Sequence, residues 1–291
     1  MRHVLLPLLL AWLALPAKAE PALPPLTAPD PGAPLYAKLP PEIRRAGVLR
    51  FVGDSHPPYR IVNDRRQIAD GLEPDLARRI ERLIGVPIKH HVVNSLSATM
   101  AGLEAGRYDL ALGPGVATLE RQKRFDGVSW LTTRPAFVFP LDRPARYSQP
   151  LDLCGKKISY VAGSVSERVT NRLNERCVAD GRPPAQHVAL VDTNMTLVAT
   201  QAGRASVAAM TLSAALHAVH INPDRFGMYS DASGSLGRDL LSLFVPKRSG
   251  LAPVIHEAIN TLMQNGQYAE VMERWGVSAV AITQSQINAA K

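Results

Sequence analysis

The chain has 291 residues, of which 46% are hydrophobic and 20% charged. This balance is typical of a globular protein with one large or two ordinary domains, and a mean hydropathy of -0.03 argues against a polytopic membrane protein. The formal charge of +8 is spread over segments of mixed sign that contain no interleaved aromatic residues. This pattern disfavours a nucleic acid as the partner.

Residues 1–19 have the pattern of a secretory signal peptide. A basic start at Arg2 is followed by an apolar stretch at 4–15 and by the small residues Ala17 and Ala19. The stretch is too short for an ordinary spanning helix, so we expect cleavage after Ala19; a buried N-terminal helix is the alternative. No cysteine lies near this point, which gives no indication of a lipid anchor. The mature protein is therefore expected to be exported.

Export changes how the two cysteines are interpreted. In an oxidising compartment Cys154 and Cys177 are expected to form a disulfide, because two free thiols would be reactive. A redox or metal site is the weaker alternative, since the chain has no Cys-x-x-Cys motif.

The first half of the chain alternates between strand and helix patterns. Residues 20–39 are rich in proline and small residues, which predicts an extended leader rather than a packed element. Further on, Leu76, Ile80 and Leu83 recur at helical spacing. The expected order is a helix at 40–46, a strand at 48–53, a helix after Gly71, a strand at 87–93, a helix at 95–106 and a strand at 108–113. Such alternation predicts a parallel sheet with ligands at the carboxyl ends of its strands.

The second half repeats this plan. The phrase AGLEAGRYDLALG at 101–113 returns as VATQAGRASVAAM at 198–210. The expected elements are strands at 155–163, 185–191 and 205–210 and helices at 164–177 and 194–203. We therefore predict two lobes of the same α/β architecture.

The tail has no counterpart in the second lobe. It consists of a predicted strand at 239–250 and two amphipathic helices at 251–276 that are separated at Gly266. A chain that crosses back to pack on the first lobe would create two crossovers, a hinge and a central cleft. The predicted first lobe is therefore 40–137 with 245–291, and the predicted second lobe is 138–244.

Five motifs, in order over about 39–277, resemble the periplasmic solute-binding proteins of the polar amino-acid ABC-transporter type, family 3. They are HPPYRIVNDRRQIADGLEPDLARRI, ALGPGVATLERQKRFD, VAGSVSE, AGRASVAA and NGQYAEVMERWGV. The resemblance implies a type II periplasmic binding protein fold that closes on a small solute and is recognised by an ABC permease in the inner membrane. It also implies a periplasmic monomer that needs no cofactor.

The resemblance further implies where the ligand lies. Arg121, with Thr118 before it, matches the arginine that clamps the ligand carboxylate, and a guanidinium suits that task; an exposed arginine on a short helix is the alternative. Gly163 and Ser164 match the anion-binding start of a helix, although Ser164 is equally an ordinary helix cap. The expected ligand-binding residues are Tyr59, Gly115, Thr118, Arg121, Trp130, Gly163, Ser164, Val165, Ser166 and Thr211.

The departures from the family pattern concern the substrate. Val116 stands where relatives carry a hydroxyl, and Thr211 stands where they carry the aspartate that pairs with the ligand's α-ammonium. Tyr59, with His56 beside it, is expected to pack on the ligand, with core packing as the alternative, and Trp130 is a candidate for an aromatic wall. Because an unpaired ammonium would be costly in a closed cleft, we expect an organic acid or a modified amino acid.

An enzyme of the same fold, similar to a cyclohexadienyl dehydratase, is the alternative function. That resemblance would place a general acid in GSVSE, where this chain has Ser166, with Glu167 on another helical face. This departure disfavours catalysis. A periplasmic accessory that signals to a sensor or a redox enzyme stays open. His217 and His220 share a helical face, but without a third ligand nearby they do not indicate a metal site.

Overall fold

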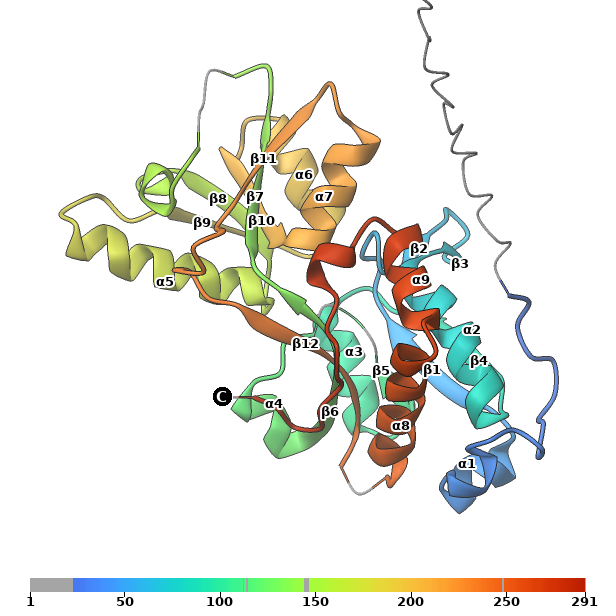
Figure 1. The fold of residues 1–291 in the computed structure, drawn as a ribbon. Helices are drawn as coiled ribbons and strands as arrows, with labels where there is room; N and C mark the ends of the chain where they lie inside the picture. The colour runs from blue at the N-terminus through green and yellow to red at the C-terminus, as the bar shows by residue number, and fades with distance from the viewer. Residues whose placement is uncertain (1–22, 112, 114, 144–146, 248, 291) are drawn as a thin grey trace, which may run out of the picture.

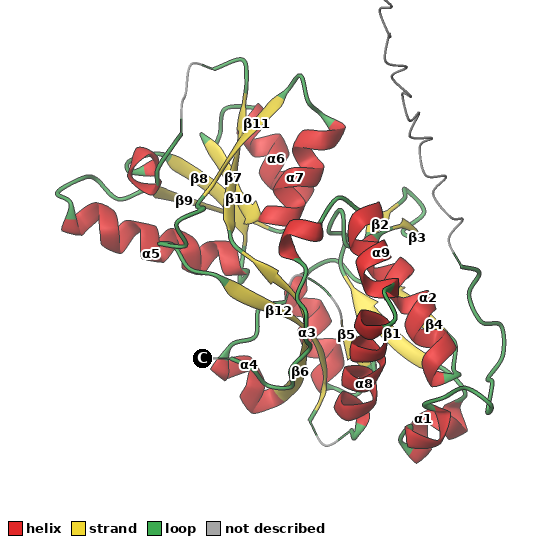
Figure 2. Ribbon diagram, in the orientation of Figure 1, coloured by secondary structure: helices red, strands yellow, loops and turns green. Residues whose placement is uncertain are grey.

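The computed structural model describes residues 23–111, 113, 115–143, 147–247 and 249–290. The expected signal peptide at 1–19 lies outside them. Two five-stranded sheets, each flanked by helices, form two lobes (Figures 1 and 2). This is the predicted two-lobe α/β architecture. Within the described residues, no helix combines the length and the apolar character that a membrane span requires.

The first lobe is built from both ends of the chain. Its sheet has the order β4-β1-β5-β12-β6, in which β1 is parallel to β4 and β5 while β12 is antiparallel to β5 and β6. Its elements are η1 (Tyr36–Lys38), α1 (Pro41–Ala46), β1 (Leu49–Gly53), β2 (Ile61–Val62), β3 (Ile68–Asp70), α2 (Leu72–Ile84), β4 (Ile88–Val92), α3 (Leu96–Glu104), β5 (Leu110–Ala111), α4 (Leu119–Arg124), β6 (Phe125–Thr133), β12 (Asp239–Pro246), α8 (Leu251–Gln264), α9 (Gln267–Arg274) and η3 (Ser278–Val280).

Helix α2 illustrates how the sequence pattern forms this lobe. Leu76 and Ile80 are fully buried and Leu83 is partly buried, so the predicted apolar stripe faces the core, where α8 and α9 also pack. The helix ends at Gly85, whose φ of 68° suits the left-handed cap.

The second lobe comes from one continuous stretch of chain. Its sheet has the order β11-β7-β10-β8-β9, with β8 parallel to β9 and β10 and β7 antiparallel to β10 and β11. Its elements are β7 (Pro135–Pro140), η2 (Pro150–Leu153), β8 (Lys157–Val161), α5 (Val165–Ala179), β9 (Gln186–Leu190), α6 (Thr193–Gln201), β10 (Val207–Thr211), α7 (Leu212–Ile221) and β11 (Phe226–Ser230).

Two crossovers join the lobes. Strand β6 of the first sheet leads into β7 of the second through Arg134 alone. The second crossover runs from β11 over 231–238 to β12, which pairs with the first sheet from Asp239 onward. The chain therefore re-enters the first lobe earlier than the expected boundary at 245. Both crossovers lie side by side, because Asp239 pairs with Thr133.

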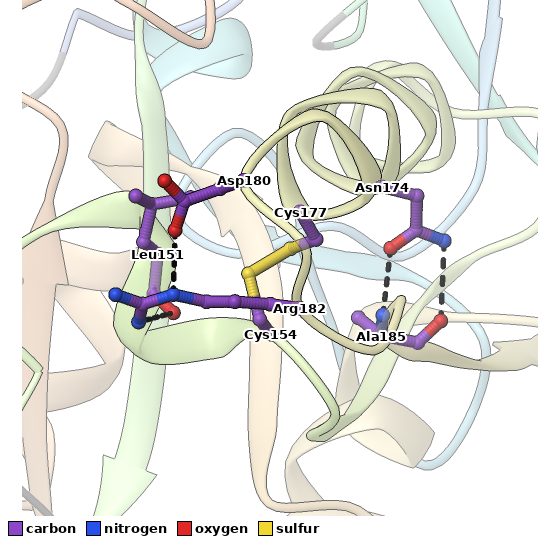
Figure 3. The surroundings of a disulfide bond; sticks show 7 residues. All are labelled: Leu151, Cys154, Asn174, Cys177, Asp180, Arg182 and Ala185. Carbon is purple, nitrogen blue, oxygen red and sulfur yellow. Dashed lines mark hydrogen bonds and ion pairs between the residues drawn. A yellow bond between two sulfur atoms is a disulfide. The ribbon is translucent and has the colours of Figure 1, made fainter.

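The predicted disulfide between Cys154 and Cys177 is confirmed (Figure 3). It joins Cys154, directly after η2, to the last turn of α5. Hydrogen bonds between Asn174 and the backbone of Ala185, of 2.7 and 3.1 Å, hold the same helix to the segment before β9.

The proline-rich leader differs from expectation. Instead of remaining unpacked, it lies against α2: the amide of Leu35 donates to the carbonyl of Leu83 at 2.8 Å, and Ala33, Leu35 and Leu39 are buried. Its few apolar residues anchor a segment whose prolines disfavour an α-helix or a central strand. The C-terminal segment also packs on this lobe, where Asn288 and Gln286 hydrogen-bond the backbone of the edge strand β6.

Candidate functional site

The carboxyl ends of the strands from both lobes meet at the lobe interface. The hydrogen bonds that cross it include His56 Nδ1 to Thr193 Oγ1 at 3.1 Å, Tyr59 Oη to Ser213 Oγ, and Arg121 Nη2 to the carbonyl of Gly163 at 3.4 Å. Each pairs a group of the first lobe with a group of the second. The lobes are thus in direct contact around the site.

Three adjoining cavities follow this interface. The Asp54 cavity is lined by Asp54, His56, Leu96, Thr99, Met100, Ala111, Gly113, Gly115, Val161, Ser164 and Phe244. The Thr193 cavity is lined by His56, Val161, Ser164, Val165, Ser166, Thr193, Thr196, Ala209, Met210 and Thr211. The hinge cavity is lined by Thr133, Arg134, Pro135, Val165, Ser166, Val169, Ala209, Met210, Thr211 and Asp239.

These cavities are small. Their volumes are about 30, 20 and 10 Å³ for the Asp54, Thr193 and hinge cavities. One water molecule needs roughly 10–15 Å³ on this scale, so they hold water but no organic solute. A solute can enter only when the lobes separate.

Arg121 is a shielded cation on the first-lobe side of this interface. It lies in α4, whose first turn Thr118 caps by accepting the Arg121 amide at 3.1 Å. Its guanidinium donates to the carbonyls of Val116, at 3.0 Å, and Gly163, and lies 5.8 Å from the ring centre of Phe244. Burial, and to a smaller extent the charge of Arg168, lowers the pKa of Arg121 to about 10. Among the described residues, no carboxylate forms an ion pair with Arg121.

Helix α5 begins opposite Arg121. Ser164 caps it by accepting the amide of Ser166 at 3.2 Å, while the amide of Gly163 donates to Glu167 at 2.7 Å. Ser164, Val165 and Ser166 line the cavities. The amide of Gly163, one of the expected anion donors, is therefore already engaged.

Gly115 and Thr211 also line the cavities, one from each lobe. A Cβ atom on Gly115 would lie 2.5 Å from the Phe244 ring, so only glycine allows the chain to pass here. Thr211 is buried and caps α7 by accepting the amide of Ala214 at 3.4 Å. It brings no charge to the interface.

The two expected aromatic residues lie deeper. Tyr59 and Trp130 are fully buried in the core, 6.0 Å apart between ring centres in an edge-on arrangement. Neither lines the three cavities, and Tyr59 reaches the second lobe through hydrogen bonds to the hydroxyls of Ser213 and Thr211.

Sequence reasoning missed a buried ionic network below the Asp54 cavity. The guanidinium of Arg60 donates to the Asp54 carbonyl at 2.7 Å, to an Asp54 carboxylate oxygen at 3.3 Å and to Glu73. Arg60 is 1% exposed, Glu73 0% and Asp54 6%. Burial raises the pKa of Glu73 to about 7, against the opposing charge of Arg60. The only signal in the sequence was one arginine between two acidic residues in a segment otherwise typical of an exposed turn.

His56 is the second missed group. Burial lowers its pKa to about 4, although the charge of Asp54 opposes this shift. It is therefore neutral near pH 7 and accepts or donates one hydrogen bond to Thr193 across the interface. The sequence pointed to this loop through Tyr59, which was expected to pack on the ligand. Nothing in the sequence showed that His56 would line the cavity.

Two other expectations concern catalysis and metals. Glu167 lines none of the three cavities, since its carboxylate binds the Gly163 amide. His217 and His220 line a separate surface groove beside Glu273, and within the described chain no cluster of three or more potential ligands is arranged to hold a metal ion.

The chain is 23% identical over 262 residues to the arginine-binding protein ArgT of Corynebacterium glutamicum, covering 89% of this chain and 84% of that protein. It superposes with a TM-score of 0.68 on an amino acid ABC transporter substrate-binding protein of Streptococcus pneumoniae bound to L-arginine, at 21% identity, covering 83% and 99% of the two chains. An ancestral amino acid-binding protein that preceded cyclohexadienyl dehydratase gives 0.68 at 18% identity, covering 80% and 97%.

These likenesses show the fold. The sequence profile of one family, described as bacterial extracellular solute-binding proteins, family 3, matches residues 49–278. This span contains both sheets, both crossovers and the cavities between the lobes. The chain therefore belongs to the bacterial extracellular solute-binding proteins of family 3.

Proposed function

We propose that this protein captures a small carboxylate-bearing solute between its lobes in the periplasm and presents it to an ABC permease of the inner membrane. The observation that carries the proposal is Arg121: a shielded guanidinium at the lobe interface with no carboxylate partner among the described residues. Burying a charge is costly unless it is paired, and a ligand carboxylate would supply the pair.

The proposed site extends from Arg121 to the residues around it. Thr118 orients the first turn of α4, and Gly115 lets the chain approach Phe244. A carboxylate that replaces the Gly163 carbonyl at Arg121 would lie at the amino-terminal end of α5, whose dipole favours an anion. Thr211 contributes a hydroxyl from the second lobe, and Tyr59 and Trp130 support the floor from the core.

Thr211 also bears on the choice of ligand. A free α-amino acid would bring an ammonium to a position where this chain has an uncharged hydroxyl, and a buried ammonium without a counter-charge is unfavourable. We therefore propose an organic acid or a modified amino acid as the ligand, in contrast to the arginine named for ArgT.

Capture is proposed to work through an open–closed equilibrium. A solute bound first by Arg121 would replace the contact with Gly163 and then touch both lobes, which favours the closed form by its differential affinity. The permease would recognise that closed form. This role is binding without catalysis, in keeping with Ser166 at the position where the dehydratase resemblance needs an acid.

The test is a thermal-shift and calorimetry screen of residues 20–291, unfolded and refolded to remove carried-over ligand. The panel contains organic acids, acylated amino acids, free amino acids and prephenate. We expect a saturable stabilisation by acids without an ammonium group, with at least tenfold lower affinity in Arg121→Gln. Arg124→Gln is the matched control, because Arg124 lies on the same helix but pairs with Glu104 at the surface. Turnover of prephenate, or tight binding of a free α-amino acid, would contradict the proposal.

A further inference from the structure

The ionic network formed by Arg60, Asp54 and Glu73 adjoins the Asp54 cavity. Asp54 lines this cavity, while Arg60 lies behind the lining, packed against the backbone of Gly53 and close to Gly113, which also lines the cavity. A Cβ atom on Gly53 would lie 1.8 Å from the guanidinium carbon of Arg60, so the guanidinium occupies the space that a side chain would fill. The ring of Phe51 lies 5.8 Å from the same carbon.

Arg60 neutralises the acidic group that faces the cavity. One carboxylate oxygen and the carbonyl of Asp54 both accept from the Arg60 guanidinium, and Glu73 binds it from the opposite side. Asp54 is the only carboxylate lining the Asp54 and Thr193 cavities in the described part of the chain. A cationic group of a ligand would therefore meet an acid that already has its counter-ion, and it would also meet the positive charge of Arg60 below.

The other polar side chains of the Asp54 cavity are also engaged. His56 bonds Thr193, Thr99 donates to the carbonyl of Ser95 at 3.1 Å, and Ser164 accepts from the amide of Ser166. The remaining side chains that line it are apolar: Leu96, Met100, Ala111, Val161 and Phe244. This compartment thus presents apolar surface rather than unpaired polar groups.

We infer that Arg60 acts as an internal counter-ion that makes the cleft select carboxylic acids with an uncharged, largely apolar body and reject those that carry an ammonium or guanidinium at the far end. The inference rests on the proposed function, because Arg121 holds the carboxylate end. It adds the class of the ligand body and names Arg60 as the positioning residue that determines it. An apolar body would meet the apolar wall, whereas a cation would be desolvated without a partner.

The experiment compares two acids that differ only in the distal charge. Hexanoate and 6-aminohexanoate are titrated by calorimetry into residues 20–291; if another acid of the screen binds better, that acid and its ω-amino analogue form the pair. We expect the uncharged acid to bind at least tenfold more tightly. Equal affinity, or preference for the amino acid, in the unmodified protein would overturn the inference.

The double variant Arg60→Met with Glu73→Gln tests the residue itself. It removes one positive and one negative charge and leaves Asp54 as an unpaired acid at the cavity. We expect the preference for the uncharged acid to fall below threefold or to reverse, and the addition of Asp54→Asn to restore it. Arg66→Met is the matched control, since Arg66 is exposed and hydrogen-bonds Asn94.

The outcomes separate the inference from the proposed function. If no carboxylate of the screen binds the unmodified protein, the proposed function fails and the inference with it. If carboxylates bind through Arg121 but the distal charge makes no difference, the inference alone fails. If the double variant folds, as its circular dichroism spectrum reports, and keeps the original preference, Arg60 is not the determinant. If it does not fold, the comparison of the two acids in the unmodified protein decides.

Discussion

Two arginines of the first lobe each lie beside a phenylalanine ring but differ in burial and in their partners. Arg60 and Arg121 are both shielded, and each lies 5.8 Å from the ring centre of a phenylalanine, Phe51 or Phe244. Arg60 binds two buried carboxylates, whereas Arg121, among the described residues, donates to two backbone carbonyls. A buried cation with its acids in place is part of the architecture, and we propose that the half-buried Arg121, which has no such acid, takes its acid from a ligand.

The largest expected effect comes from breaking the paired arginine. Arg60→Met leaves Asp54 and Glu73 buried without a counter-ion, which we expect to lower the free energy of unfolding by about 3–5 kcal/mol. Urea denaturation followed by circular dichroism measures this change. Arg121→Met should change the same quantity by less than about 1 kcal/mol, because it leaves no acid unpaired. Equal losses in the two variants would contradict the difference drawn between the arginines.

The next largest effect is expected at acid pH, where His56 becomes a further cation beside Arg60. In the closed form the pKa of His56 is lowered to about 4, mainly by burial, while Asp54 and Asp192 oppose the shift and Arg60 adds to it. Closure therefore releases a proton from His56. The closed form has its full stability above about pH 6.5 and loses it as the pH falls towards 4. At pH 5 the balance should move towards the open form by about thirtyfold, on the order of 2 kcal/mol.

Small-angle X-ray scattering at pH 7.5 and pH 5 measures this opening as a larger radius of gyration. His56→Asn removes the titrating group but keeps a polar side chain that can reach Thr193, so its scattering should change little between the two pH values. A protein whose profile opens equally in both forms would assign the acid response to other groups.

The smallest expected effect concerns the ring next to Arg121. Phe244→Leu keeps an apolar side chain in the Asp54 cavity but removes the aromatic face, so the affinity for a carboxylate ligand should fall by about two- to fivefold. Calorimetry with the best-binding acid measures the change. Phe51→Leu changes the corresponding ring beside Arg60 and should affect stability rather than affinity. An equal loss of affinity in both variants would show that the ring beside Arg121 has no specific role in ligand binding.

The sequence predicted elements wherever the pattern was local. The apolar stripe of α2 and the disulfide were expected and are present, and Ser164 caps α5, which is one of the two roles expected of it. The leader was misjudged because its proline-rich composition obscures three apolar anchors. Strands β6 and β7, which form the first crossover, were not singled out, since β6 pairs with β12 and β7 pairs with β10 and β11, all of which lie far along the chain.

The candidate site also contains residues that the sequence predicted and residues that it did not. Arg121 and the start of α5 came from a resemblance in short motifs, and both lie at the lobe interface. Arg60 stands in a stretch with Asp64 and Arg65 that is typical of an exposed turn, and its burial depends on Glu73 reaching it from α2. An ion pair between two elements leaves no periodic trace in a sequence, so no pattern in one chain could reveal it.

The position of β12 has a consequence for the order of assembly. This strand lies between β5 and β6, yet it is made after the whole second lobe. A growing chain can complete the inserted lobe from the contiguous stretch 135–230, while the first lobe keeps a gap in its sheet until Asp239–Pro246 arrives. We therefore expect the second lobe to fold first, and the first lobe to remain incomplete until the last part of the chain is available.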